Sequence, residues 1–123
     1  MAPENALVFV AEDSASWQAT YKRVLPAAGH QVVATATSLV KASEAIPTLA
    51  EQGVQVAIVD GNLGLVSMDG EDGAIVVERL RAEVPGIKIV GVTSDPDGVR
   101  GADVNIRKSE IDPTKLNETI TGL

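Results

Sequence analysis

The segment VQVAIVD, residues 54–60, is apolar at nearly every position and ends in an aspartate. A strand with one face in water alternates apolar and polar residues, whereas an unbroken apolar run is typical of a parallel strand buried on both faces. The segment therefore predicts the central strand of a parallel sheet. Its last residue, Asp60, is followed by the turn-forming sequence GNLG, so we expect its carboxylate at the end of that strand.

Similar short runs of β-branched residues occur on both sides of this segment and alternate with longer segments of helical period. This pattern predicts an α/β fold, with a parallel sheet flanked by helices. The four further strands that we expect cover residues 6–11, 31–36, 87–93 and 103–108. The expected helices cover residues from about 14 to 29, from about 38 to 53, around 73–84, and a last segment that begins at about 112.

The connection between the last two expected strands is unusually short. Only SDPDGVRGA, residues 94–102, lies between them. A parallel crossover normally takes a dozen or more residues together with its helix. We therefore expect the fourth helix of the alternation to be reduced to a turn or loop.

The composition is that of a single domain, residues 1–123, whose 45% hydrophobic residues suffice for a core of ordinary size. The net charge of -7 argues against binding to nucleic acid or to an anionic membrane, because both require clustered Lys and Arg. Mg²⁺ and basic protein surfaces are more suitable partners. No apolar run approaches the ~18 residues of a membrane span and no signal-type N-terminus is present, so we expect a cytoplasmic protein.

The chain contains no cysteine, which excludes disulfides and thiolate nucleophiles. Its aromatic and imidazole side chains are Phe9, Trp17, Tyr21 and His30, too few for surfaces that stack on bases or sugars. Trp17 and Tyr21 share the inner face of a helix, so core packing is the first interpretation and partner recognition the second. His30, at the start of a strand, is expected on the surface.

Polar side chains follow the expected strands at the point where each apolar run stops. In an open α/β sheet, ligands bind outside the carboxyl ends of the strands, where the strand order reverses. We therefore expect the polar groups at these ends to converge on one crevice. They are Glu12, Asp13, Asp60, Thr93, Ser94 and Lys108.

Three carboxylates in one crevice would repel one another unless a cation lay among them. Mg²⁺ suits such a site, because it binds carboxylate and carbonyl oxygens together with water. A carboxylate can also attack phosphorus, given a metal, a cation and a small donor for the phosphoryl oxygens. Asp60 as nucleophile with Asp13, Lys108 and Thr93 would supply those parts.

At this point the sequence resembles the receiver domain of two-component response regulators, also called CheY-like. The resemblance spans essentially the whole chain. It rests on five segments in the family's order: VFVAEDS, VAIVDGNL, DGAIVVERLR, IVGVTS and NIRKS. It implies the flavodoxin-like strand order 2-1-3-4-5, and phosphorylation of Asp60 by a histidine kinase or phosphotransfer protein.

The resemblance also implies roles for the remaining strand-end residues. Mg²⁺ would be held by Asp13, Asp60 and the main-chain carbonyl of Asn62, with Glu12 reaching it through water. Lys108 would pair with one phosphoryl oxygen and the Thr93 hydroxyl with another, while the small Ser94 would leave the site open. Any catalysis would be self-phosphorylation from a phosphohistidine and autodephosphorylation.

Three features depart from the family's pattern. Gly64 lies in the region where a proline is common, and the following loop GLVSMDGED is longer than usual. The aromatic residue of the fifth strand is replaced by Asn105, and the fourth helix is nearly absent. We therefore expect the usual output face to be changed even where the phosphorylation site is kept.

The resulting hypothesis is a stand-alone receiver that signals through protein contacts. We expect loss of the fourth helix to expose Val90, Val92 and Val104, and to favour a homodimer through this face. The first alternative is a receiver-like interaction module that phosphorylation does not switch. A small flavodoxin-like cofactor binder is a second alternative, although no anion-binding loop is visible.

Each site residue also has a purely structural interpretation. Asp60 would be a turn or cap residue, and the pair Glu12-Asp13 would cap the first helix. Lys108 would be a solvated cation, with Arg107 as a competitor for the same role.

Overall fold

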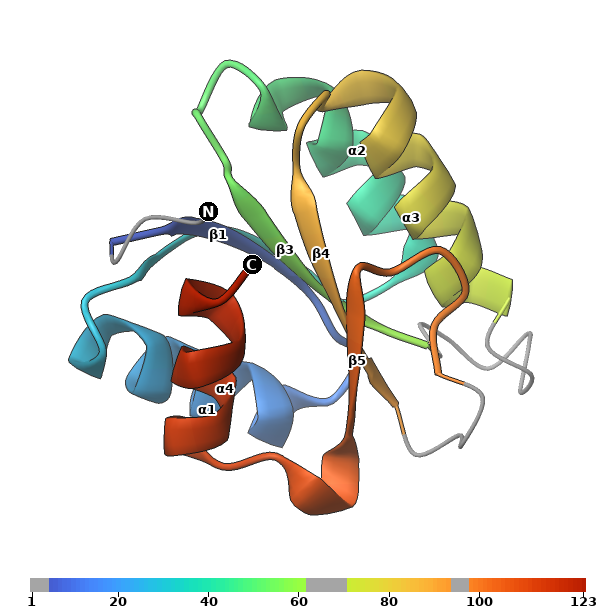
Figure 1. Cartoon of the computed structure of the whole chain (residues 1–123). Helices are drawn as coiled ribbons and strands as arrows, with labels where there is room; N and C mark the ends of the chain where they lie inside the picture. The colour runs from blue at the N-terminus through green and yellow to red at the C-terminus, as the bar shows by residue number, and fades with distance from the viewer. Residues whose placement is uncertain (1–4, 62–70, 94–97) are drawn as a thin grey trace.

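The structure is a computed structural model that describes residues 5–61, 71–93 and 98–123. A parallel sheet runs through it, with helices on both faces (Figure 1). The strands are β1 (Leu7–Ala11), β2 (Gln31–Ala36), β3 (Val56–Asp60), β4 (Lys88–Thr93) and β5 (Val104–Arg107). The helices are α1 (Ala15–Ala27), α2 (Leu39–Leu49), α3 (Glu71–Glu83) and α4 (Pro113–Thr121), and a short 3₁₀ turn, η1 (Lys108–Glu110), follows β5.

The strand order is β2-β1-β3-β4-β5, and all four neighbouring pairs are parallel. This confirms the doubly wound α/β fold and the flavodoxin-like order. β3 lies in the middle of the sheet, and all five of its residues are buried, as the apolar segment 54–60 predicts. Among the described residues, no helix combines the length and the apolarity that crossing a membrane requires.

Side chains of β3 alternate between two hydrophobic layers, because successive residues of a strand point to opposite faces. Val56 and Ile58 pack in the layer between the sheet and the helices α1 and α4. Ala57 and Val59 pack in the layer under α2 and α3. Figure 1 shows these two helix pairs on opposite faces of the sheet. The central strand is thus shielded from water on both faces, and Asp60 stands at its carboxyl end, where ligands bind in sheets of this kind.

Polar caps fix the points where three helices begin. The Ser14 side chain accepts a hydrogen bond from Trp17 N, and the Ser38 side chain accepts one from Lys41 N. Asp112 caps α4 in the same way and precedes Pro113, the first helical residue. Ser14, rather than the acidic pair before it, is therefore the N-cap of α1.

Between β4 and β5, the described residues 98–103 form a turn in place of a helix. Asn105 anchors this turn: its Oδ1 accepts a hydrogen bond from Val99 N at 2.8 Å. Val99 is 1% exposed and lies over Gly91 of β4, where a Cβ would stand only 2.7 Å from the Val99 Cβ. Val99 therefore covers the patch of sheet that Gly91 leaves without a side chain.

Arg81 of α3 ties the other end of the same turn to the sheet. Its guanidinium donates to Ile87 O at 3.0 Å and to Gly101 O at 2.9 Å. It also lies 3.1 Å from Asp103 Oδ2, which in turn accepts a hydrogen bond from Ile89 N. These contacts hold the connection against α3 without a helix of its own, and Figure 1 shows the connection running beside α3.

The expectation that the short connection would expose Val90 and Val92 is wrong. Both side chains are 0% exposed and belong to the layer under α1 and α4. Val104 is half-buried against the same layer. The missing helix would lie on the opposite face of β4, which carries Ile89 and Gly91. The exposed apolar surface of Val90 and Val92, on which the predicted homodimer was based, is therefore not present.

The expectation of a surface position for His30 is also wrong, because its side chain is only 2% exposed. Its Nδ1 accepts a hydrogen bond from Ala6 N at 3.0 Å, and its Nε2 lies 2.9 Å from Asn117 Oδ1. The ring thus links the start of β1 to α4. Asn117 lies 87 positions away along the chain, so local sequence gave no sign of this contact.

We predict that Arg81→Met lowers the free energy of unfolding by about 1–2 kcal/mol. The carbonyl oxygens of Ile87 and Gly101 would lose their charged donor, and Asp103 its ionic partner. The matched control is Arg79→Met in the same helix, since Arg79 is exposed, and we expect a change within ~0.5 kcal/mol. Urea unfolding measures both; an equal loss in the two variants would contradict the role given to Arg81.

Candidate functional site

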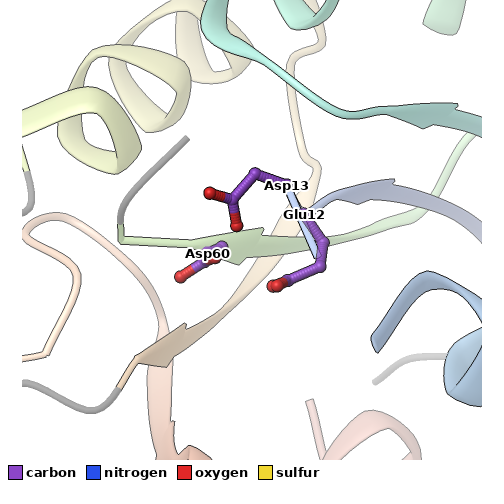
Figure 2. A group of neighbouring side chains, drawn as sticks. All are labelled: Glu12, Asp13 and Asp60. Atoms are coloured by element: carbon purple, nitrogen blue, oxygen red, sulfur yellow. The ribbon is translucent and has the colours of Figure 1, made fainter. Parts of the chain in front are cut away.

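Three carboxylates meet at the carboxyl ends of β1 and β3. Glu12 and Asp13 follow β1 directly, and Asp60 is the last residue of β3, the strand beside it. One oxygen from each lies within 4.8 Å of the others, and Figure 2 shows the three side chains converging. Glu12 is 1% exposed and Asp60 3%, whereas Asp13 is exposed. The parallel sheet therefore brings together an acidic cluster that is mostly shielded from water.

Lys108 reaches this cluster from the end of β5, the edge strand of the sheet. Its Nζ lies 3.0 Å from Glu12 Oε1 and 3.2 Å from Asp60 Oδ2. The lysine begins the 3₁₀ turn η1 immediately after β5, and its side chain is 19% exposed. Arg107, the competitor in the sequence, is exposed in β5. The structure thus brings Lys108 to the acidic cluster.

Thr93 ends β4, beside β3, and is 3% exposed. Its Oγ1 would lie 2.9 Å from a Cβ at residue 61, so the absence of a side chain at Gly61 allows the hydroxyl to approach the residue that follows Asp60. Gly73 of α3 has a similar role, because a Cβ there would stand 2.8 Å from Asp60 O. Two glycines therefore let β4 and α3 close around the end of β3.

Two positions of the predicted site, Asn62 and Ser94, lie outside the described residues. One further site residue was not predicted, namely Gln18 of α1, which is 6% exposed. Its Nε2 donates to Glu12 O at 3.0 Å and to Ala36 O at 3.2 Å, which ties the ends of β1 and β2 together. A polar residue on the inner face of a helix that follows a strand-end acidic pair was the available signal.

The pKa values of the cluster show how the charges interact. Burial raises the pKa of Glu12 from 4.5 to about 7, and the negative charge of Asp60 adds to the rise, against the hydrogen bond from Lys108. Burial by itself would lower the pKa of Lys108, but its hydrogen bond to Glu12 and the charge of Asp60 raise it overall. Burial also raises the pKa of the nearby Tyr21 hydroxyl, and both carboxylates contribute. Negative charge is thus in excess at the site, and one lysine compensates only part of it.

The donor set fits a hard divalent cation. All three side chains offer carboxylate oxygens, the ligands that Mg²⁺ binds in proteins. Glu12 Oε2 is moreover buried and has no hydrogen-bond partner in the described part of the chain. A cation among the carboxylates would remove their mutual repulsion and would satisfy this oxygen directly or through water.

Solved structures of similar fold cover nearly the whole chain. A CheY-like response regulator receiver domain protein from Methanospirillum hungatei JF-1 is 23% identical, with a TM-score of 0.74 over 96% of this chain and 92% of that chain. The receiver domain of the putative response regulator NarL from Mycobacterium tuberculosis is 21% identical, with a TM-score of 0.76 over 98% and 96%. The chain has the fold of a response regulator receiver domain.

A third receiver fold, from a modulated diguanylate cyclase of Desulfovibrio desulfuricans G20, gives a TM-score of 0.77 at 21% identity over 96% of this chain and 92% of that chain. Its structure is described as an example of alternate folding. Comparisons with protein-family models and with curated protein sequences give no match. The receiver fold therefore rests on the three-dimensional similarity, and the site must be interpreted from its own geometry.

We predict that Glu12→Gln stabilises the metal-free protein above pH 7. The pKa of Glu12 is higher in the folded chain, at about 7, than its ordinary value of 4.5. The folded state therefore binds the extra proton between these values, and stability from this group is lost as the pH rises from 4.5 to 7. Glutamine keeps the shape of the neutral acid, so we expect a gain of about 1–3 kcal/mol at pH 8 that disappears near pH 4.

Urea unfolding in EDTA at pH 4 and pH 8 tests this prediction. The matched control is Glu118→Gln, because Glu118 is exposed on α4 and should show no comparable difference between the two pH values. Added Mg²⁺ should reduce the advantage of Glu12→Gln at pH 8. A variant that is less stable than the wild type at pH 8 in EDTA would show that Glu12 is stabilised, not strained, in its charged form.

Proposed function

We propose that the chain acts as a response regulator receiver, which accepts a phosphoryl group on Asp60 from a phosphohistidine of a histidine kinase or phosphotransfer protein. The observation that carries this proposal is the contact of Lys108 Nζ with Asp60 Oδ2 at 3.2 Å, inside the acidic cluster. It pairs a carboxylate nucleophile with the cation that an incoming phosphoryl group requires. The receiver fold of the chain supports the same conclusion.

In the proposed transfer, an oxygen of Asp60 attacks the phosphorus of the phosphohistidine. A P–O bond forms, the P–N bond breaks, and its electron pair returns to the imidazole nitrogen of the donor. Lys108 then donates a hydrogen bond to one phosphoryl oxygen, and the Thr93 hydroxyl donates to another. Water later attacks the same phosphorus, which releases phosphate and restores the carboxylate. The small side chain of Ser94 is proposed to leave this approach open.

Glu12, Asp13 and Asp60 are proposed to hold Mg²⁺ in this site, with Glu12 acting through water and the main-chain carbonyl of Asn62 as a further ligand. When bound, the ion would neutralise charge on the phosphoryl oxygens. The chain's own residues contribute the rest. Asp60 provides the nucleophile, Lys108 fixes the direction of the phosphoryl group, and the shielded end of β3 limits access of water.

The output is proposed to pass through contacts with another protein in the cytoplasm. The described connection between β4 and β5 differs from the family's pattern, because Asn105 and Arg81 hold a turn where the family has a helix. Val99, the residue held by Asn105, lies within 3.7 Å of the Cβ position of Gly61, beside Thr93. We propose that a change in the position of Thr93 is transmitted to this turn through Val99.

A specific observation favours the alternative of a receiver-like module that phosphorylation does not switch. Asn105 occupies the position of the family's aromatic residue, and its amide is hydrogen-bonded to Val99 N. A side chain fixed in this way cannot follow a movement of Thr93 by changing its rotamer unless these bonds break. Phosphorylation without any change in the turn at residues 98–102 would support this alternative.

We predict that the protein becomes phosphorylated in the presence of Mg²⁺ and acetyl phosphate, and that Asp60→Asn removes the reaction. The amide of asparagine is a poor nucleophile for phosphorus, so a phosphate-affinity gel should show a shifted band for the wild type alone. Asp112→Asn is the matched control, because asparagine also serves as an N-cap and Asp112 is not one of the three clustered carboxylates. If neither acetyl phosphate nor a cognate kinase gives an Asp60-dependent shift, the proposed function is wrong.

We predict that Asp13→Asn weakens Mg²⁺ binding by at least about tenfold, because it removes one charged ligand from the acidic cluster. Isothermal titration calorimetry with MgCl₂ measures the change, again with Asp112→Asn as control. EDTA should also abolish phosphorylation of the wild type. Equal Mg²⁺ affinity in Asp13→Asn and the wild type would exclude Asp13 as a ligand.

A further inference from the structure

Trp17 stands in the first turn of α1 and is tied to the acidic cluster through the helix cap. Ser14 Oγ accepts a hydrogen bond from Trp17 N at 3.4 Å, while Ser14 N donates to Glu12 Oε1 at 3.3 Å. The same Glu12 oxygen accepts the hydrogen bond from Lys108 Nζ. The cap therefore links the backbone of Trp17 to the carboxylate that holds Lys108.

The ring of Trp17 lies directly beside the lysine that the site requires. Lys108 Nζ is 5.5 Å from the ring centroid, within the ~6 Å at which an ammonium is attracted to an aromatic face. Tyr21, which is fully buried, supports the ring from the next turn of α1 at a centroid distance of 5.9 Å. The ammonium is thus surrounded by the indole ring and by the carboxylates of Glu12 and Asp60.

A lysine needs such support at this point of the fold. Its side chain has a flexible four-carbon stem that loses rotamer entropy when it is fixed. Lys108 starts from the end of an edge strand and reaches across to carboxylates on β1 and β3. After transfer it must exchange an oxygen of Asp60 for a phosphoryl oxygen. Glu12 and Trp17 take no part in the bonds that change, so they can hold Nζ during the exchange.

We propose that Trp17 is a positioning residue for the proposed phosphoryl transfer, which holds the Lys108 ammonium against Asp60 through its aromatic face. This inference rests on the proposed function of Asp60. The ring also lines a groove of about 220 Å³ between α1 and α4, together with Val24 and Leu116. Loss of this packing is a separate effect of any Trp17 substitution, and the test must distinguish it from loss of the aromatic face.

The test compares Trp17→Leu, Trp17→Phe and Val24→Ala in phosphorylation by acetyl phosphate with Mg²⁺. This small donor needs no protein docking, so an effect on kinase binding does not enter. We expect Trp17→Leu to slow phosphorylation by roughly 3- to 30-fold, because the aromatic face is lost. Trp17→Phe keeps an aromatic face, so its phosphorylation rate should stay within about threefold of that of the wild type. Val24→Ala, which only reduces packing in the same groove, should stay within about twofold.

A second measurement probes the contact between Trp17 and Lys108 in the unphosphorylated protein. Trp17 is the single tryptophan of the chain, so intrinsic fluorescence reports its surroundings alone. Lys108→Met should change the emission spectrum of Trp17, whereas Lys41→Met, on an exposed position of α2, should not. Circular dichroism melting checks that each variant is folded. If Trp17→Leu does not fold, the fluorescence comparison still decides.

Two outcomes would overturn the inference and leave the proposed function intact. In the first, the wild type is phosphorylated on Asp60 and Trp17→Leu reacts as fast, or Val24→Ala is slowed as much as Trp17→Leu. In the second, Trp17 emission is the same in Lys108→Met and the wild type. An absence of any Asp60-dependent phosphorylation in the wild type would instead refute the proposed function, and the positioning role with it.

Discussion

The ion pairs of Lys108 with Glu12 and Asp60 are the interaction on which the rest of the site depends. Two nearly buried carboxylates at the ends of neighbouring strands repel each other, and burial makes their charged forms costly. One lysine offsets only part of this cost. The remaining negative charge, together with Glu12 Oε2, which has no hydrogen-bond partner among the described residues, makes the site suitable for a divalent cation, as the phosphoryl transfer that we propose for Asp60 requires.

The connection between β4 and β5 shows how a doubly wound sheet can tolerate the loss of a helix. A helix normally covers the sheet with several side chains, whereas here Val99 covers Gly91, and Asn105 and Arg81 hold the turn by hydrogen bonds. Polar contacts of this kind depend on direction, unlike hydrophobic burial. The turn is therefore held in one position by specific bonds.

Much of the fold followed from local patterns. The unbroken apolar segment before Asp60 predicted the central strand, and the short segment 94–102 predicted the reduced helix. The sequence-based predictions were wrong where contacts join segments that are distant in the chain. The burial of His30 depends on Asn117 in α4, and the burial of Val90 depends on which face of β4 meets α1 and α4. The burial of these two side chains cannot be predicted from the neighbouring residues, because it depends on how the helices pack on the sheet.

The sequence by itself determined the order of strands and helices and the polar groups at the strand ends, because periodicity and strand-end position are local properties. Only the tertiary structure decided which cation reaches Asp60. Lys108 and Arg107 are neighbours in the chain, yet the pleat of β5 and the turn after it direct Lys108 to carboxylates 48 and 96 positions away. The same packing brought the face of Trp17 beside this lysine, a contact that no sequence spacing specifies.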